Sequence, residues 1–233
     1  MPLDIAAVQR VLATEGLDGW LLYDFHGSNP IASRIAGLTA GDGHMTTRRW
    51  YYLIPAAGQP MGLVHAIERH NLDALPGEKT VYAERNQLEA GLTALLRGRK
   101  RVAMEYSPGC AIPYLSRVDA GTAEAIRSRG IEIVSSGDLV QRFEASWSAS
   151  QLDTHQRASA ALYRIKDQAL DAIRKALADR TPVTEYQIQQ LMSGWFRDEG
   201  LVSDSEPVVA ARENGGNPHY IPTATRTRTI GAD

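Results

Sequence analysis

A single stretch decides the fold of this chain: Arg49-Trp50-Tyr51-Tyr52-Leu53-Ile54-Pro55-Ala56-Ala57-Gly58-Gln59-Pro60-Met61-Gly62-Leu63-Val64-His65. It contains two short runs of apolar and aromatic residues, 49–54 and 61–65, separated by a segment rich in proline, alanine and glycine. Such runs are typical of strands, and a short segment with proline and glycine between them is typical of a turn. The stretch therefore predicts a β-hairpin.

Helical patterns alternate with strand patterns on both sides of this hairpin. Before it, Asp4 can cap a helix that ends just ahead of Gly16. The apolar positions of that helix recur at helical spacing and are Ile5, Val8 and Leu12. The apolar run 20–23 follows as a buried strand, and 24–29 follows as a loop.

After the hairpin, Asn86 and Glu89 resemble a capping box that opens a further helix. A strand pattern follows at 102–106, then a helix that ends near Arg129, then a strand pattern at 131–134. Helices that alternate with strands predict an α/β domain with flanking helices, and the hairpin makes its sheet mixed.

From Ser148 onward the pattern changes to two long helices. The first is predicted to carry one apolar face that includes a core-edge histidine, with positions Leu152, His155, Ala158, Leu162, Ile165, Leu170, Ile173 and Leu177. A capping box of Thr184 and Gln187 opens the second helix, which ends before Gly200. The apolar run 207–210 then predicts one strand.

Two amphipathic helices and one strand need a larger sheet to bury their apolar faces. We therefore expect the second region to be part of a larger domain, with an exposed helix pair that is prone to aggregation and proteolysis. The alternative is that the residues after Ala211 form a disordered tail, which the Thr/Arg alternation at 225–229 permits.

Bulk properties exclude several classes of protein. The 233 residues carry 25 Lys and Arg against 27 Asp and Glu, a net charge of -2, so we expect no nucleic-acid partner. The densest basic run, 97–101, is best interpreted as a solvated connection. Cys110 is the only cysteine, which excludes a disulfide framework, and no window suits a leader peptide or a membrane span. These features predict a cytoplasmic protein without a membrane partner.

The loop 213–220, Glu-Asn-Gly-Gly-Asn-Pro-His-Tyr, surrounds His219 with two glycines, two asparagines and a proline. These residue types fix unusual backbone angles, so a histidine among them can be held in one direction. The alternative interpretation is a surface turn with a solvated histidine.

The order of elements, together with Asn217-Pro218-His219-Tyr220, resembles the creatinase, prolidase and methionine aminopeptidase superfamily, whose catalytic half is called the pita-bread fold. The closest similarity is to Xaa-Pro dipeptidases and aminopeptidases. The stretches that carry the resemblance are 49–55, 103–108, 118–122, 183–186 and the histidine loop.

The resemblance implies a division of the chain into two domains. Residues 1–147 would form a creatinase/prolidase-like N-terminal domain with a mixed α/β sheet. Residues 148–233 would supply the first helices and strand of an incomplete pita-bread catalytic domain. Proteins of this family are often homodimers, so the resemblance also implies a homodimer.

The resemblance assigns His219 the role of orienting the substrate near the scissile bond, with Asn217 and Tyr220 as substrate-binding residues. The substrate would be a proline-containing dipeptide or oligopeptide. In the family, two divalent ions (Mn, Co or Zn) activate water, and two aspartates, one histidine and two glutamates hold them beyond the position of His219. Here the only acidic residue after His219 is Asp233, and 231–233 resembles the turn that precedes the first ligand.

We therefore expect no metal ligands and no bound cofactor on this chain. The function implied is that of the N-terminal portion of a proline-specific metallopeptidase, inactive by itself. Two alternatives stay open: a non-enzymatic dimerisation or peptide-binding module of the same superfamily, and a fragment of a creatinase-like amidinohydrolase.

Two other groups of histidine and acidic residues resemble functional sites. His65 and His70 flank Glu68 but are five residues apart, which does not fit the zinc-protease helix, so a strand end and loop are expected there. Asp24 and His26 follow a buried strand, where a structural turn is favoured over a role at a substrate entrance.

Overall fold

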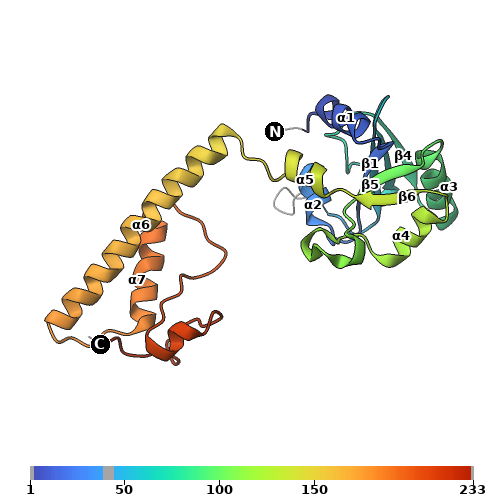
Figure 1. The fold of residues 1–233 in the computed structure, drawn as a ribbon. Helices are drawn as coiled ribbons and strands as arrows, with labels where there is room; N and C mark the ends of the chain where they lie inside the picture. Colours follow the sequence, from blue (N-terminus) through green and yellow to red (C-terminus); the bar gives the residue numbers. More distant parts are fainter. Residues whose placement is uncertain (1–2, 39–44, 232–233) are drawn as a thin grey trace. The chain divides into compact units, whose positions relative to one another are not determined.

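The computed structural model describes residues 3–38 and 45–231. The chain divides into two compact units, Met1–Ser146 and Trp147–Asp233 (Figure 1). The first unit holds the whole sheet, and the second is built from helices and irregular segments.

One six-stranded sheet, in the order β4-β3-β2-β1-β5-β6, forms the centre of the first unit. Its strands are β1 (Gly19–Asp24), β2 (Trp50–Pro55), β3 (Met61–His65), β4 (Glu78–Tyr82), β5 (Arg101–Met104) and β6 (Glu132–Ser135). Strand β2 is antiparallel to β1 and β3, whereas β3–β4, β1–β5 and β5–β6 are parallel pairs. The hairpin and the mixed α/β sheet predicted from the sequence are both confirmed.

Strand β4 lies at the sheet edge, where the sequence analysis predicted no strand. Its residues, Glu-Lys-Thr-Val-Tyr, are mostly charged or polar, and only Tyr82 is buried. Edge strands often carry such residues, which weakens the apolar signal. Just before β4, Gly77 has a φ of 103°, and a Cβ there would meet the Pro60 carbonyl oxygen at 2.0 Å. Glycine at this position is what lets β4 begin beside β3.

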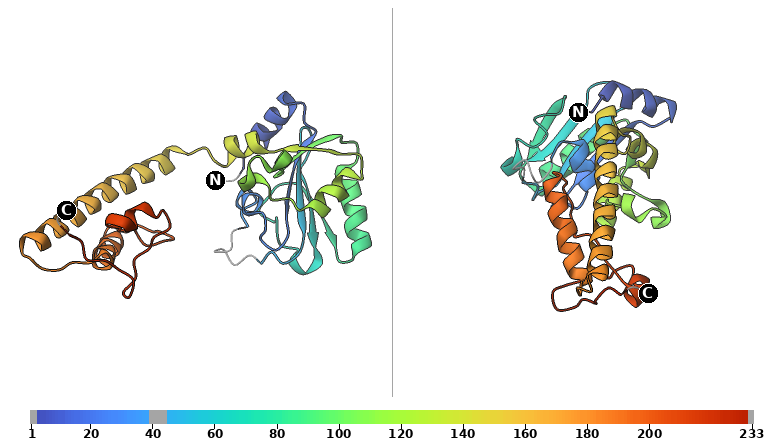
Figure 2. Two further views of the ribbon diagram at one scale, coloured as in Figure 1. Left: turned by 60° about the horizontal axis from the view of Figure 1, so that its bottom comes forward. Right: turned by 90° about the vertical axis from the view of Figure 1, so that its left-hand side faces the viewer.

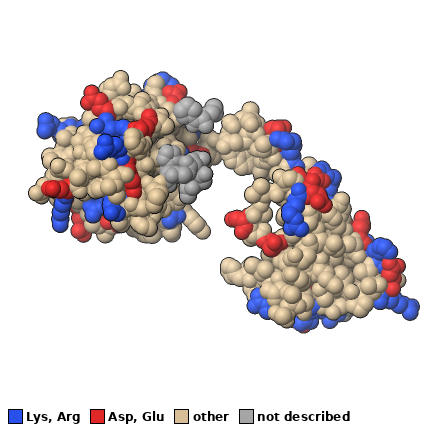
Figure 3. Space-filling view, turned by 180° about the vertical axis from the view of Figure 1, so that it is seen from behind, with Lys and Arg blue, Asp and Glu red and all other residues tan. Residues whose placement is uncertain are grey.

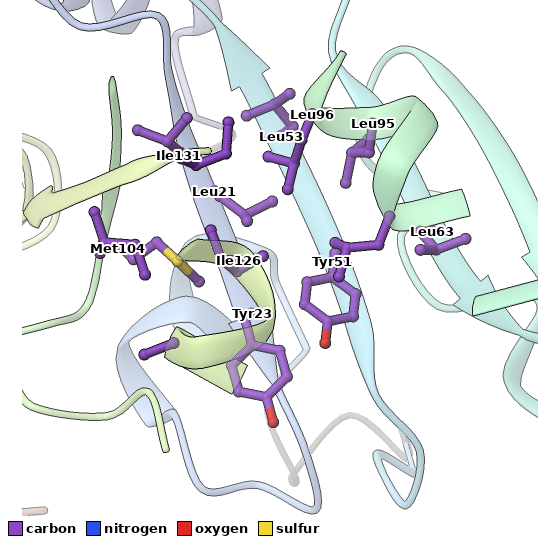
Figure 4. Close-up of a cluster of buried hydrophobic side chains, with 14 of the residues drawn as sticks. Leu21, Tyr23, Tyr51, Leu53, Leu63, Leu95, Leu96, Met104, Ile126 and Ile131 are labelled. Carbon is purple, nitrogen blue, oxygen red and sulfur yellow. The ribbon is translucent and has the colours of Figure 1, made fainter. Parts of the chain in front are cut away.

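Helices cover both faces of the sheet. The helices are α1 (Ile5–Thr14), α2 (Pro30–Ile35), α3 (Arg85–Leu96), α4 (Ala120–Arg127) and α5 (Gly137–Phe143). Successive residues of a strand point to opposite faces. Accordingly Leu21 and Tyr23 of β1 pack in a cluster with α3 and α4, and Figure 4 shows Leu21 beside Ile126 of α4. Trp20 and Leu22 pack with α1, α2 and α5. Strand β1 is thus buried on both faces.

The helix caps confirm one prediction and correct another. Asp4 caps α1 as predicted, because its Oδ1 accepts a hydrogen bond from the third amide after it at 2.9 Å. The predicted capping box of Asn86 and Glu89 is wrong. The box of α3 forms two residues earlier, between Glu84 and Gln87, because the longer glutamate side chain can also accept from the first turn.

A buried carboxyl group ties together the ends of several elements. Glu105 follows β5 and is fully buried, and it accepts hydrogen bonds from Trp20 Nε1 (2.8 Å), Asn29 Nδ2 (2.8 Å) and Ser136 Oγ (3.1 Å). Burial raises the pKa of Glu105 above its ordinary value, and the three donors oppose that rise without cancelling it. Asn29 also caps α2.

The loop after β1 is a structural turn. Asp24 is fully buried and accepts hydrogen bonds from the backbone amides of Gly27 (3.0 Å) and Asn29 (2.7 Å). His26 lies in this turn with a φ of 59°. The carboxylate of Asp24 is therefore used to shape the chain, in agreement with the favoured interpretation.

The second unit begins with α6 (Ala149–Ala178) and α7 (Glu185–Asp198), which pack against each other (Figure 2). Both begin as the sequence predicts. The Ser148 side chain caps α6, and the capping box of Thr184 and Gln187 opens α7. No helix in the described part of the chain is long and apolar enough to cross a bilayer.

The predicted apolar face of α6 is buried along only a narrow stripe. The fully buried positions are Ala161, Ile165 and Ala169. Leu152, Leu162 and Leu170 remain 45%, 46% and 41% exposed. The physical reason is that α7 packs along one side of α6, and residues four apart form a single ridge on a helix. The exposed character predicted for this helix pair is thus present in the structure.

Two further expectations for the second unit are wrong. His155 is exposed and lies with its ring centroid 4.5 Å from that of Trp147, so it does not border a core. The run 207–210 is not a strand. Side chains of α7 pair instead with backbone groups at the two ends of this run. Gln189 Nε2 donates to the Pro207 carbonyl at 3.0 Å, and the Ala211 amide donates to Glu185. Within the described residues, the second unit has one isolated bridge, between Thr184 and Thr229.

Candidate functional site

The loop that carries His219 has a defined backbone. A 3-10 turn, Arg212–Gly216, leads into it. Asn217 then shapes the next residues, because its Oδ1 accepts from the His219 amide at 3.0 Å and its carbonyl accepts from the Tyr220 amide at 3.0 Å. The His219 side chain is exposed, and its imidazole has no hydrogen-bond partner in the described ranges 3–38 and 45–231. A fixed backbone therefore presents a free imidazole.

The residue after His219 is the anchor of the loop. Tyr220 is only 6% exposed, and its hydroxyl donates to Oε2 of Glu185 at 2.6 Å. The guanidinium of Arg226 lies 5.7 Å from the centroid of the Tyr220 ring, at a distance suited to a cation–π contact. The pKa of Tyr220 is raised, and the largest cause is the hydrogen bond to the Glu185 carboxylate. The phenol therefore keeps its proton and stays a donor.

Glu185, the first residue of α7, organises this whole region from a fully buried position. Besides Tyr220 it accepts hydrogen bonds from the backbone amides of Ala211 (2.6 Å) and Arg228 (2.8 Å). Asn214 Nδ2 lies within 3.0 and 3.1 Å of its two oxygens. One carboxylate thus joins the segments before and after His219 to the start of α7.

The hydrogen bonds keep Glu185 ionised. Burial by itself would raise the pKa of this carboxyl, but the donors from Tyr220, Asn214, Ala211 and Arg228 together lower it below its ordinary value. Hydrogen bonds to an ionised acceptor are stronger than neutral ones. The charge also lies at a helix N-terminus, where the helix dipole favours an anion. The site is therefore a preorganised loop held by one buried negative charge.

The chain after His219 also completes the cap of α7. Glu185 N donates to the Arg228 carbonyl at 3.0 Å, and Tyr186 N donates to Thr227 Oγ1 at 3.0 Å. These amides belong to the first turn of a helix, which cannot pair within the helix itself. Residues 220–230 are therefore ordered against α7, contrary to the alternative of a disordered tail after Ala211.

Sequence reasoning located the loop but missed Glu185. The stretch Val183-Thr184-Glu185-Tyr186 carries part of the family resemblance, but nothing in it gives the carboxylate a role. The only local signal is an acidic residue directly after a helix cap, which is common on solvated helices. Burial of Glu185 depends on residues 26 to 43 positions further along the chain, and these distances leave no local pattern.

The described residues do not form a metal centre. No group of three or more His, Cys, Asp or Glu side chains suited to an ion occurs among them. Glu185 has the carboxylate that a cation would need, but five donor contacts already occupy its two oxygens. Asp233 lies outside the described residues. The predicted roles of His219, Asn217 and Tyr220 in substrate binding stay predictions.

Solved structures of dipeptidases and prolidases share this fold. Dipeptidase PepE from Mycobacterium ulcerans superposes with a TM-score of 0.58 at 17% identity, over 97% of this chain and 56% of that protein. Recombinant prolidase from Thermococcus sibiricus superposes with a TM-score of 0.59 at 15% identity, over 97% and 57%. No protein-family model and no curated protein sequence matches.

The predicted resemblance to prolidases is thus confirmed at the level of the fold. The chain spans little more than half the length of each of these two proteins. Likeness at such identities establishes how the backbone is arranged and does not establish the activity.

Proposed function

We propose that this chain is the N-terminal portion of a proline-specific metallopeptidase that hydrolyses Xaa-Pro peptides. The observation that supports this most is the attachment of the His219 loop to Glu185, in a fold shared with a dipeptidase and a prolidase. Five hydrogen-bond contacts to Glu185 fix the chain on both sides of His219, which a turn with a merely solvated histidine does not require. In this proposal the first unit is a complete N-terminal domain, and the second is the first part of a catalytic domain.

In this proposal His219 orients the substrate. An imidazole can donate or accept a hydrogen bond, and that of His219 is exposed on a fixed backbone. Asn217 is also exposed, and its amide nitrogen is available to a peptide carbonyl because only its oxygen is used by the loop. Tyr220 has its hydroxyl on Glu185, so its part is to hold His219 in place.

The metal ions belong to the longer protein. Two divalent cations, Mn, Co or Zn, would supply activated water at neutral pH, and residues other than those described here would hold them. We expect the 233-residue chain alone to bind no stoichiometric metal and to cleave no Xaa-Pro dipeptide. The longer protein would act on proline-containing peptides as a homodimer in the cytoplasm.

The experiment is to read the gene beyond codon 233 and to express the open frame that follows. The extended protein is expected to bind two divalent ions and to hydrolyse Ala-Pro. His219→Ala should lower kcat/KM by roughly a hundredfold, the order seen when one positioned hydrogen-bond donor is removed. The control is His155→Ala, which changes an exposed histidine in the same unit and should leave kcat/KM unchanged.

Three results would contradict the proposal. A native stop codon at this point would favour the non-enzymatic dimerisation or peptide-binding module. Hydrolysis of creatine by the extended protein without metal would favour the amidinohydrolase. Robust Ala-Pro cleavage by the 233-residue chain itself would contradict the expectation that its activity needs further residues.

A further inference from the structure

The first unit contains a cavity of about 570 Å³ that is separate from the His219 loop. It opens where the end of β1 and the start of β2 meet the first turns of α3 and α4. A second hollow of about 370 Å³ adjoins it and shares Phe25, Arg49, Arg85, Leu88 and Glu89. The cavity lies at one end of the antiparallel pair β1–β2, and its size is usual for sites that bind small molecules.

Two cations in this cavity lack a counter-ion. Arg49 and Arg85 line both hollows, and neither guanidinium forms an ion pair with a carboxylate of the described residues. Arg49 lies with its guanidinium carbon 6.0 Å from the centroid of the Phe25 ring. Arg48 lines the adjoining hollow and adds a third positive charge. Arginine pairs with planar carboxylates through two parallel hydrogen bonds, so these side chains suit an anionic ligand.

The carboxylates that share the cavity are already engaged. Asp119 caps α4 and accepts from Thr122 N (2.9 Å), Thr122 Oγ1 (2.7 Å) and Tyr23 Oη (2.9 Å). Glu89 pairs with Arg129. In the adjoining hollow, Glu84 accepts from the first turn of α3. Arg129 balances the charge of Glu89, whereas the donors to Asp119 are neutral and leave its negative charge in place. Two arginines therefore face one uncompensated carboxylate in this cavity, which favours a ligand with a single negative charge.

Tyr51 supplies a neutral donor at the same place. It is 2% exposed, and its ring centroid lies 5.0 Å from that of Tyr23. Figure 4 shows the hydroxyls of both tyrosines at the same end of the cluster. The Tyr23 hydroxyl donates to Asp119, whereas the Tyr51 hydroxyl lies near Arg49 and donates to no side chain of the described residues. Burial raises the pKa of Tyr51 to about 12, so its hydroxyl keeps its proton and can donate.

Part of the remaining wall is apolar. Phe25 is 44% exposed, and Leu88, Leu92 and Ala125 lie around the same cavity. Apolar surface beside unpaired cations favours a ligand with both a hydrophobic part and a charge. The first turns of α3 and α4 also line the cavity, through Arg85 and Gly121, and Glu84 and Asp119 cap these two helix ends.

We propose that this cavity binds a hydrophobic carboxylate, a singly charged organic anion. Its carboxylate lies between the guanidinium groups of Arg49 and Arg85, with the Tyr51 hydroxyl as a further donor. Its apolar body lies on Phe25, Leu88 and Leu92. The site is confined to the first unit and does not depend on the peptidase function proposed above.

The test is an NMR titration of the 233-residue chain with three probes. N-acetylphenylalanine has both the charge and the apolar body, its primary amide lacks the charge, and acetate lacks the body. The acid is expected to bind at least about tenfold more tightly than either of the others, because each loses one kind of contact. Chemical-shift changes are expected at Tyr51 and Arg85. Equal affinity for the acid and its amide would overturn the proposal.

Variants locate the site. Arg49→Ala and Arg85→Ala are each expected to weaken binding of the acid by about tenfold. Arg97→Ala removes an equally exposed arginine at the far end of α3 and should have no effect. Tyr51→Phe keeps the buried ring and should weaken binding by a smaller factor. Unchanged binding by both cavity variants would overturn the assignment, and tighter binding of inorganic phosphate than of the acid would replace the carboxylate with a phosphate ligand.

Discussion

The Tyr220 hydroxyl donates a 2.6 Å hydrogen bond to Glu185, a carboxylate 35 residues earlier in the chain. This contact joins the loop of His219 to the first residue of α7. It makes the geometry of an exposed histidine depend on a buried acid that sequence reasoning did not identify.

Replacing that acid should release the loop. Glu185→Gln removes the charge and leaves the partly buried amides of Ala211 and Arg228 with a weaker acceptor. We expect a loss of about 1–3 kcal/mol in the free energy of unfolding of this region. Amide hydrogen exchange at 211–230 should become faster. Glu213→Gln is the control, because Glu213 is 73% exposed and its ion pair with Arg228 is worth about 1 kcal/mol at most.

The second unit should lose stability in acid because of Glu185. The carboxyl of Glu185 has a lowered pKa in the folded state, so its contribution is present above the unfolded value of 4.5 and is lost as the pH falls through the folded value. Hydrogen exchange of the 211–230 amides, measured from neutral pH downward and corrected for intrinsic rates, should reveal the loss. Glu185→Gln should remove this dependence. The same acid dependence in the variant would show that another group causes it.

Glu105 should give the first unit the opposite pH dependence, a stability that falls as the pH rises. Its pKa is raised by burial, so the folded state binds a proton more tightly than the unfolded state. The free energy of unfolding should therefore decrease as the pH rises from about 4.5 through the folded value, and should level off above it. Urea unfolding monitored by tryptophan fluorescence gives this curve. Glu105→Gln, which keeps the shape but cannot ionise, should flatten it, and a curve of unchanged slope would contradict this assignment.

Two glycines with similar backbone angles should respond differently to alanine. Gly77 and Gly58 have φ values of 103° and 94°. At Gly77 a Cβ would overlap the Pro60 carbonyl, whereas at Gly58 no atom lies within 4 Å. Gly58→Ala should cost about 1 kcal/mol from the backbone angle alone. Gly77→Ala should cost about 3 kcal/mol or more, since β4 must move away from β3. Thermal unfolding of both variants measures the difference, and equal costs would contradict it.

The stability of the α6–α7 pair should depend on the narrow stripe of buried side chains on α6. Ile165→Ala removes a side chain that is 1% exposed and should destabilise the second unit by about 2–4 kcal/mol. Leu162→Ala, three residues earlier and 46% exposed, should cost less than about 1 kcal/mol. Limited proteolysis near α6 reports on both. Comparable losses in the two variants would indicate that a further surface covers Leu162.

On the face drawn in Figure 3, surface charge gives no sign of a polyanion partner. The face in Figure 3 shows basic and acidic residues interspersed, without a continuous basic area. This distribution agrees with the nearly balanced composition, 25 basic and 27 acidic residues. The unpaired arginines of the first unit are therefore better suited to a small anion than to a nucleic acid.

The sequence by itself determined the elements whose signals are local. The hairpin of β2 and β3, the buried strand β1 and the caps at Asp4 and Thr184 were predictable, because strand period, turn residues and capping are properties of neighbouring residues. The resemblance to the prolidase fold could also be recognised from short stretches. The edge strand β4 was missed because it buries little apolar surface.

Only the tertiary structure decided what the polar residues do. Burial of Glu185 and Glu105 requires donors that lie tens of residues away, and a carboxylate in a local window looks the same whether it is solvated or buried. The same holds for Arg49 and Arg85, whose shared cavity depends on how α3 packs on the sheet. Local patterns specify where the backbone turns and which faces are apolar. The environment of a charge is set by long-range packing, and the chemistry of both sites depends on that environment.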